Sequence, residues 1–509
     1  MNGKSAPGAA RPELLLFLGI PLYFYVNLFT PAGTPFLLGG DQIYFWVWAQ
    51  RMFHGERIYL DFFQFTPPGT DLLYLTFFRL FGLHLWVTNL VVFLLGLALC
   101  GICLSIAGQI MSRKMSLLAA WLFLSLIYGQ LLNATHHWFS VLAVLGAARV
   151  LMPVQNRARI AAAGALLGTA SFFTQTTGVA GALACTLALA LRPGAVHRRR
   201  DIPINSGILL LAFVTAWGVL SAHTIAATGF KTIEYFQIYY PSHFMVYGFG
   251  SRFPGFPEAL TLKTLPHLLR YLAVYVIAFS VSPIAFWLSR RQKQRIEDDV
   301  AWRVTLLATV GLLLLLAVLP GLNWLRLFAV SLPELILLAW LIGRMERGRT
   351  AILALSWAVV AVLAAGHTWS RYREPHRTML LPAGKAVVDT HNFEKYSWLL
   401  SRTKPGDWFF QSAWPGAYIP LLLRNPVFLD ALMTDNETRP EFVARTLADL
   451  ERRQVRYILW TPRLNTPDPA LPGQDHLAPL QSYIVAHYAR IHVFSDQDEI
   501  WERRAGPGS

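Results

Sequence analysis

Charged residues are scarce in this chain of 509 residues. Asp, Glu, Lys and Arg make up 14% of it, whereas hydrophobic residues make up 54%, and the mean hydropathy is +0.41. Soluble globular proteins carry about 25% charged residues. The scarcity excludes an ordinary soluble protein and a disordered one, and it indicates a polytopic membrane protein that is embedded in a lipid bilayer.

Cysteine is also rare, and several catalytic signatures are missing. Cys100, Cys103 and Cys185 all lie inside apolar runs, where small thiols are ordinary packing residues. A Cys-x-x-Cys redox or zinc site needs polar surroundings or further ligands, and the sequence offers neither. A Walker loop, a zincin helix and a nucleophile-elbow serine are absent, which argues against ATP-driven transport and against a hydrolase. We expect no disulfide framework and no cofactor, and nothing indicates a divalent metal.

The formal net charge is +15, from 44 Lys and Arg against 29 Asp and Glu. In a soluble protein such a charge can indicate nucleic-acid binding. Here the basic residues lie in short loops between apolar runs, as the positive-inside rule describes for cytoplasmic loops. The charge therefore indicates topology, and we expect no nucleic-acid partner.

Apolar runs recur up to residue 370 and predict about 11 transmembrane helices. Each is near the ~20 residues that cross ~30 Å of hydrocarbon. The run 160–191 is too long for one crossing, has a polar middle and is flanked by arginines, so we interpret it as two helices joined by a tight periplasmic turn. The predicted spans are 14–30, 84–110, 115–132, 138–153, two within 160–191, 204–227, 266–289, 302–320, 324–342 and 350–369. The first has no small-residue cleavage site and is expected to be retained.

The positive-inside rule also predicts where the loops lie. The basic loops all fall on one side of the spans, which places the N-terminus in the cytoplasm. The opposite side receives the loops 31–83 and 228–265 and everything after about residue 370. We therefore predict a membrane domain over 1–370 and a C-terminal part, 371–509, outside the cytoplasm.

The C-terminal part differs in character from the spans. It mixes charged and apolar residues, and strand-like pieces alternate with helical ones, which predicts a small α/β domain. The strand-like pieces include 407–410 and 457–460, and the helical pieces are 393–401 and 440–454.

The segment 39–82 is too polar for a span and too aromatic for an ordinary solvated loop. Asp41 follows two glycines and precedes Tyr44, Phe45 and Trp48, which share one face of a helix. Amphipathic aromatic rings favour the membrane interface. We expect this helix to lie there, with its acid near the lipid headgroups.

The order of residues in this segment resembles the first periplasmic loop of the bacterial GT-C membrane glycosyltransferases. It is similar to that loop in the lipid A aminoarabinose transferase, the protein O-mannosyltransferases and the rhizobial core-sugar transferases. The resemblance covers about the first third of the chain. It rests on Asp41, Tyr44, the spacing from Ala49 to Gly55, Tyr59-x-Asp61, Pro67-Pro68-Gly69 and Phe78-x-x-Phe81-Gly82.

The resemblance implies a GT-C-like glycosyltransferase of the bacterial inner membrane. Such an enzyme would transfer a sugar, a hexose or a pentose, from a polyprenyl-phosphate-linked donor to a lipid, glycan or protein acceptor on the periplasmic side, with inversion. Two positions depart from the pattern: Gln42 stands where relatives often have Glu, and Thr66 where many have Lys. Two alternatives stay open, a lipid or polysaccharide carrier resembling a flippase, and a non-catalytic relative that acts in envelope assembly.

Two acids are the candidate catalytic residues. Asp41 could accept the proton of the acceptor hydroxyl as that hydroxyl attacks the anomeric carbon, or it could merely cap the helix that it starts. Asp61 could share this work or orient the substrate, or it could only pair with Arg57 and hold the loop.

A phosphate leaving group needs a cation because negative charge grows on it. With Thr66 in place of Lys, the candidates are Arg57, Lys231, Arg252 and Arg326. Arg326 lies within a predicted span near its periplasmic end, where an ionisable residue is a functional candidate. The alternative is that it snorkels to the headgroups.

Further candidates could bind the donor or its sugar. His136 and His137 are expected to line the site rather than to hold a metal, because adjacent helical residues point in different directions. Aromatic rings beside charges suit a carbohydrate, and equally an interfacial belt. This set comprises Tyr44 and, in the second loop, Tyr240 and His243.

Overall fold

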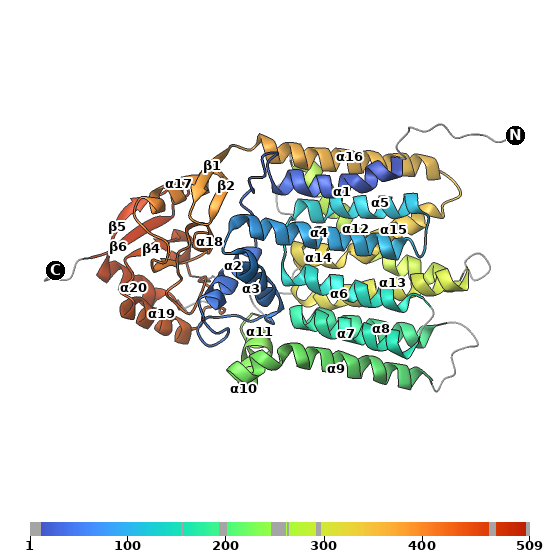
Figure 1. Ribbon diagram of the computed structural model, residues 1–509, viewed down its shortest axis with the longest axis horizontal. Coiled ribbons are helices and arrows are strands. Elements are labelled where there is room, and N and C mark those ends of the chain that lie inside the picture. Colours follow the sequence, from blue (N-terminus) through green and yellow to red (C-terminus); the bar gives the residue numbers. More distant parts are fainter. Residues whose placement is uncertain are drawn as a thin grey trace.

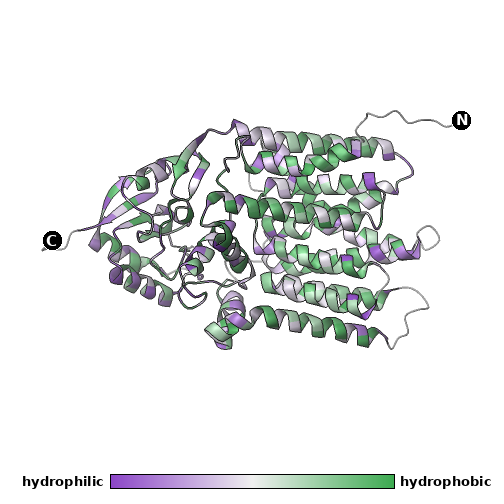
Figure 2. Ribbon diagram, viewed as in Figure 1, coloured by the Kyte–Doolittle hydropathy of each residue, from purple (hydrophilic) through white to green (hydrophobic). Residues whose placement is uncertain are grey.

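The computed structural model describes residues 12–153, 156–192, 201–245, 261, 264–291, 297–467 and 475–504. Apolar helices lie side by side in a bundle, and a mixed segment of helices and strands lies at one end of it (Figure 1). The first described residue, Pro12 at the start of α1, is at the opposite end. Figure 2 shows that the bundle is largely hydrophobic, whereas the mixed segment alternates hydrophilic and hydrophobic residues.

Every predicted span coincides with a helix or a helix pair. The helices are α1 (Pro12–Leu28), α4 (Leu85–Ala107), α5 (Arg113–Leu126), α6 (His136–Leu151), α7 (Arg157–Phe173), α8 (Gln175–Leu191), α9 (Asp201–Thr228), α12 (Leu265–Arg291), α13 (Asp298–Val318), α14 (Trp324–Val330), α15 (Leu332–Gly343) and α16 (Arg349–Arg373). Among the described residues, five helices are long and apolar enough to cross a membrane, or six if α14 and α15, bent by 52°, form one span. The chain is thus a multi-pass membrane protein, and the count of 11 spans stays a prediction.

The long run 160–191 is two helices, as expected from its polar middle. Thr174 is extended, with φ −146° and ψ 112°, and separates α7 from α8. The two helices return against each other at close range, because Gly178 faces Ser171 and Gly181 faces Leu167. The absence of a side chain at Gly178 permits this approach.

The segment 39–82 folds into α2 (Gln42–Phe53) and α3 (Gly69–Phe81). That α2 lies in the membrane interface stays a prediction, although most of its aromatic face is covered by protein. Phe45, Trp46 and Trp48 are buried within the protein. The rings are covered because α3 and the C-terminal segment pack around α2 (Figure 1), and this tertiary cover cannot be read from the helical period.

The second loop begins with α10 (Phe230–Glu234) and continues through the π-helical turn η2 (Tyr235–Tyr239) to α11 (Tyr240–His243). Two short 3-10 turns, η1 (Tyr128–Gln130) and η3 (Leu319–Gly321), lie at bundle ends. Arg252, a candidate phosphate ligand, lies outside the described residues.

The C-terminal segment alternates strands and helices, as its sequence predicts. Its strands are β1 (His376–Leu381), β2 (Gly384–Asp389), β3 (Phe409–Gln411), β4 (Tyr457–Trp460), β5 (Tyr488–Val493) and β6 (Glu499–Arg503). Its helices are α17 (Thr390–Leu400), α18 (Tyr418–Leu421), α19 (Pro440–Arg452) and α20 (Ala478–His487), with the short turn η4 (Pro462–Asn465). The strands β1 and β2 form a hairpin, and a second sheet has the order β3-β4-β6-β5, with β3 parallel to β4 and the other pairs antiparallel.

This segment packs directly on the loop between α1 and α4. The backbone of Leu37 donates to Val387, that of Phe63 donates to Phe428, and that of Leu85 donates to Ala383. One hydrophobic core runs through both parts. That 371–509 forms a separate domain therefore stays a prediction, and the junction between the two parts is where the site lies.

Candidate functional site

A cavity of about 310 Å³ lies where the bundle end, the loop of α2 and α3, the second loop and the C-terminal segment meet. Its walls are mainly aromatic and apolar, with a few charged groups, as is usual for small-molecule sites. The lining residues are Asp41, Tyr44, Phe45, Trp48, Phe63, Phe65, Thr66, His136, His137, Tyr240, Met245, Asn323, Arg326, Trp414, Leu429, Asp430, Ala431, Met433, Glu437 and Thr438.

Asp41 directly precedes α2 and lines this cavity. Gly40 precedes it with φ +82°, a conformation that glycine adopts without strain. Asp41 itself has helical backbone angles, φ −54° and ψ −19°, and its side chain makes no capping hydrogen bond. The alternative in which Asp41 only caps the helix therefore lacks the contact that defines a cap.

The Asp41 side chain is exposed at the cavity, and the protein atoms around it exclude part of its water. This partial burial raises the pKa of Asp41, because the charged form loses water. Arg326 opposes the rise, since its positive charge favours the carboxylate. The pair can thus hold a carboxylate that is less well solvated than one on the surface.

The contacts of Gln42 explain why an amide stands where relatives often have an acid. Its side chain is fully buried, and its Nε2 donates to the carbonyls of Gly39 at 2.8 Å and Leu132 at 3.4 Å. Its Oε1 accepts from the backbone N–H of Ala134 at 3.1 Å. A carboxylate could not donate to those carbonyls. Gln42 therefore ties the start of α2 to the loop before α6.

Arg326 enters the cavity from the first turn of α14. Asn323 caps this helix by accepting from the backbone N–H of Arg326 at 2.9 Å. The Arg326 Nη1 donates to the Gly321 carbonyl, also at 2.9 Å. Both Asp41 and Glu437 interact electrostatically with the guanidinium. The structure thus brings one predicted phosphate ligand to the same cavity as Asp41.

The adjacent histidines His136 and His137 both line the cavity. His136 and His137 open α6, and their ring centroids lie 3.9 Å apart. The Nδ1 atom of His136 is buried without a hydrogen-bond partner. Among the described residues, no group of three or more His, Cys, Asp or Glu side chains could hold a metal ion. That the protein uses no metal stays a prediction.

The C-terminal segment supplies lining residues that the sequence did not point to. Trp414 meets the Tyr44 ring edge to face at 5.3 Å. Burial raises the pKa of Glu437 to about 7, with a further rise from Asp435 and a smaller opposing effect from Arg326. No local signal could have found these residues, because they lie more than 370 positions after Asp41.

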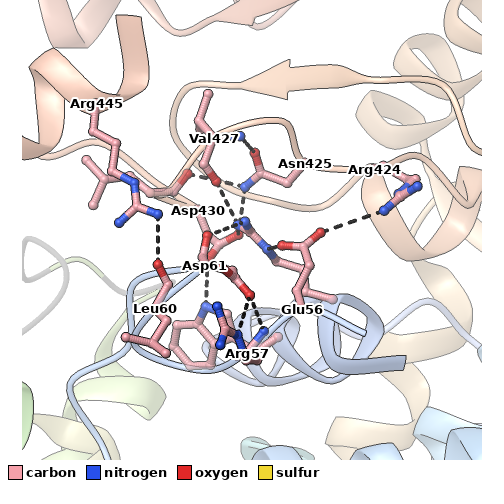
Figure 3. A network of polar contacts seen from close by, with 12 residues as sticks. Glu56, Arg57, Leu60, Asp61, Arg424, Asn425, Val427, Asp430 and Arg445 are labelled. Atoms are coloured by element: carbon pink, nitrogen blue, oxygen red, sulfur yellow. Dashed lines mark hydrogen bonds and ion pairs between the residues drawn. The ribbon is translucent and has the colours of Figure 1, made fainter. Parts of the chain in front are cut away.

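A buried ion pair joins α2 to this segment (Figure 3). The Arg51 Nη1 donates to Asp430 at 2.9 Å and to the Val427 carbonyl at 2.8 Å. Its Nε donates to Glu56 at 2.7 Å. The Asp430 carboxylate also accepts from Trp48 at 2.6 Å and from Asn425 at 2.6 Å. Both charges are fully bonded, so this network positions the cavity wall.

The remaining candidates that the structure describes do not line the cavity. Asp61 accepts from the backbone and side chain of Arg57, at 2.7 and 3.4 Å, and both side chains are well exposed. His243 contacts the Tyr239 carbonyl and is exposed. Lys231, in α10, is exposed and does not line the cavity. Of the sequence candidates, the cavity brings together Asp41, Tyr44, His136, His137, Tyr240 and Arg326.

No protein-family model and no curated protein matches this sequence. The fold is similar to that of ArnT from Cupriavidus metallidurans bound to undecaprenyl phosphate, with a TM-score of 0.61 and 13% identity, covering 98% of this chain and all of that one.

The fold is also similar to two structures of the oligosaccharyltransferase AglB from Archaeoglobus fulgidus. One is in complex with an inhibitory peptide and a dolichol-phosphate, with a TM-score of 0.55 and 11% identity, covering 90% of this chain and 70% of that one. The other, with Zn and sulfate, has a TM-score of 0.51 and 12% identity, covering 88% and 67%. These similarities show that this chain shares the fold of ArnT and of the oligosaccharyltransferase AglB.

Proposed function

We propose that this protein transfers a sugar from a polyprenyl-phosphate-linked donor to a hydroxyl group of a lipid, glycan or protein acceptor. The observation that carries the proposal is the Asp41 carboxyl, which makes no capping bond and shares a mainly apolar cavity with Arg326. The two structural neighbours bound to undecaprenyl phosphate and to a dolichol-phosphate support a lipid-phosphate donor. The cavity's aromatic walls suit the sugar and the first isoprene units.

In the proposed reaction, the hydroxyl oxygen of the acceptor attacks the anomeric carbon of the sugar. As it does so, a carboxylate oxygen of Asp41 accepts the proton of that hydroxyl. The new C–O bond forms on one face of the sugar while the bond to the phosphate oxygen breaks on the other, which inverts the configuration. The phosphate leaves with the bonding electron pair, and Arg326 stabilises the charge that develops on it. His136 can donate or accept a hydrogen bond at the donor.

We further propose that the cavity faces the periplasm of a bacterial inner membrane, with eleven spans, the N-terminus in the cytoplasm and the C-terminal segment outside. Two arguments support this arrangement. The basic loops recur on one side of the predicted spans. The C-terminal segment lies at the end of the bundle opposite Pro12, the start of α1 (Figure 1), and residues of this segment line the cavity.

The test is sugar transfer from radiolabelled polyprenyl-phosphate sugars by the purified protein. Asp41→Asn should lower the rate about 10²–10⁴-fold, because the amide cannot accept the proton. Asp61→Asn is the matched control, since Asp61 lies in the same loop but outside the cavity, and it should retain transfer. Equal loss in both variants, or equal transfer by Asp41→Asn and the native chain, would reject Asp41 as the base.

One observation favours a carrier as the second candidate function. Glu334, in the first turn of α15 after the bend from α14, is fully buried, and its Oε2 has no hydrogen-bond partner. Broken helices with buried acids are typical of secondary transporters. A carrier would move a lipid-linked sugar across vesicles equally well with Asp41→Asn, and Glu334→Gln would abolish that movement.

A further inference from the structure

Two arginines at the end of the bundle near the C-terminal segment retain unused hydrogen-bond donors. Arg270 lies on α12 and Arg371 on α16. The Nε of Arg270 and the Nε and Nη2 of Arg371 are buried and have no hydrogen-bond partner. Buried polar groups are normally satisfied, so such donors need an explanation. Neither arginine lines the cavity that contains Asp41.

The protein neutralises these arginines only weakly. Arg270 donates to the Gln130 amide oxygen and lies over the Tyr271 ring at 4.9 Å. Arg371 lies over the Phe36 ring at 4.7 Å. The acid that acts on Arg371 is Glu374, which is itself exposed and near His376. Within the part of the chain that the structure describes, no carboxylate forms an ion pair with Arg270 or Arg371.

Further polar groups face the same place from neighbouring helices. His367, one turn before Arg371, interacts electrostatically with both arginines. The Tyr23 ring of α1 lies 6.5 Å from the His367 ring, and the Tyr23 hydroxyl is buried without a partner. Asn27 donates to Thr368 at 3.0 Å and so holds α1 against α16. The cluster therefore gathers side chains from α1, α12 and α16.

The excess of hydrogen-bond donors in this cluster favours binding of an anion with several acceptor oxygens. Two guanidinium groups and a hydroxyl offer donors in excess of acceptors, and arginine binds phosphate oxygens in a bidentate manner. The surrounding surface is apolar, because exposed large side chains lie on the same helices near both arginines. They are Leu269, Leu272, Trp369 and Tyr372. An anion that suits both the donors and this surface is the headgroup of a membrane lipid.

We propose that Arg270, Arg371 and His367 form a site for the phosphate group of a membrane lipid, separate from the cavity that contains Asp41. The site lies close to that cavity's wall. Tyr271, next to Arg270, contacts the Trp324 ring of α14 at 4.3 Å, and Arg326 lies two residues further along α14. The proposal stands on the orphaned donors and does not depend on the proposed transferase function.

The test is lipid retention by the purified full-length protein in a neutral detergent, measured by native mass spectrometry. Every sample carries the Arg326→Gln substitution, so that a phosphate bound in the Asp41 cavity contributes little to the measured retention. The probes are phosphatidic acid, phosphatidylcholine, undecaprenyl phosphate and inorganic phosphate. Phosphatidic acid should be retained over phosphatidylcholine. Replacing both arginines, by Arg270→Gln and Arg371→Gln, should weaken that retention about tenfold or more.

The matched control is Arg373→Gln, which removes the same charge from the exposed end of α16 and should leave retention unchanged. Arg371→Lys, which keeps the charge but not the fork, should give an intermediate loss. Equal retention of phosphatidic acid with and without both arginines would overturn the proposal. The proposal would also be overturned if the protein with both arginines retained phosphatidylcholine as well as it retains phosphatidic acid. Displacement by an equal concentration of inorganic phosphate would overturn the lipid assignment, whereas a preference for undecaprenyl phosphate would identify the lipid.

Discussion

At the scale of single residues, the cavity shows how neighbours decide what a side chain does. An Asp at a helix start ordinarily caps the helix, yet the Asp41 carboxyl makes no such bond and faces Arg326 across a cavity. Gln42, beside it, does the opposite. Its amide is fully used in joining two loops, which is why an acid would not serve there.

Arg326 should control both the rate and its dependence on pH. Asp41 must be ionised to act as a base, burial raises its pKa, and Arg326 lowers it. Activity should therefore be lost as the pH falls through the pKa of Asp41. Arg326→Gln should shift this acidic limb to higher pH and reduce kcat about 10²–10³-fold. The measurement is a pH–rate profile of both proteins, and an unshifted acidic limb would contradict the electrostatic pairing.

At the scale of elements, a close helix–helix contact and a buried ion pair hold together the elements around the site. The α7–α8 hairpin depends on a glycine at the contact between its helices. The position of α2 depends on Arg51, whose guanidinium is bonded to Asp430, Glu56 and backbone carbonyls. The helix–helix contact should be disrupted by adding a side chain, whereas the ion pair should be disrupted by removing a charge.

A side chain at Gly178 should destabilise the hairpin. A Cβ there would overlap the backbone nitrogen and the Oγ of Ser171. Gly178→Ala should therefore cost about 1–3 kcal/mol, as overpacking does, measured as a lower Tm in detergent. Gly101→Ala in α4 is the control, because no atom lies within 4 Å of its Cβ position. It should be neutral or slightly stabilising, and an equal loss in both variants would point to a cause other than this contact.

Breaking the pair between Arg51 and Asp430 should loosen the C-terminal segment from α2. Arg51→Met leaves Asp430 buried without its cation, a change that typically costs about 3–5 kcal/mol. The exposed pair of Arg57 and Asp61 should contribute only about 0–1 kcal/mol, so Asp61→Asn serves as the comparison. Hydrogen exchange over residues 424–430 would report the loosening, and unchanged protection in Arg51→Met would show that other contacts hold the junction.

At the scale of the whole molecule, the cavity belongs to no single part of the chain. Asp41 comes from the first loop, His136 and Arg326 from the bundle, and Trp414 and Glu437 from the C-terminal segment. The C-terminal segment therefore forms part of the cavity wall and also packs against the first loop. The cavity must open on the side of the membrane where this segment lies.

The proposed topology can be tested with single cysteines. Cys100, Cys103 and Cys185 are buried, so they should react little. Lys404→Cys, in the exposed loop before β3, should react with a membrane-impermeant maleimide added to intact cells. Arg347→Cys, in the exposed loop between α15 and α16, should react only after the membrane is opened. The reverse pattern would invert the topology.

The sequence alone determined the class of protein and the places of its helices. Apolar composition and the polar break at 174 are local properties, so they predict spans and the α7–α8 division without knowledge of packing. The strand and helix pieces at 457–460 and 440–454 were also local signals. Asp41 was identified by a short motif for the same reason.

Only the tertiary structure decided which candidates meet. It brought Asp41, Arg326 and His136 to one cavity and left Asp61, Lys231 and His243 outside it. It also buried most of the aromatic face of α2, which the interfacial preference of aromatic rings alone would leave at the membrane surface. The physical reason is that the cavity's charges come from segments separated by hundreds of residues, and only the packing of the C-terminal segment on the first loop determines their distances.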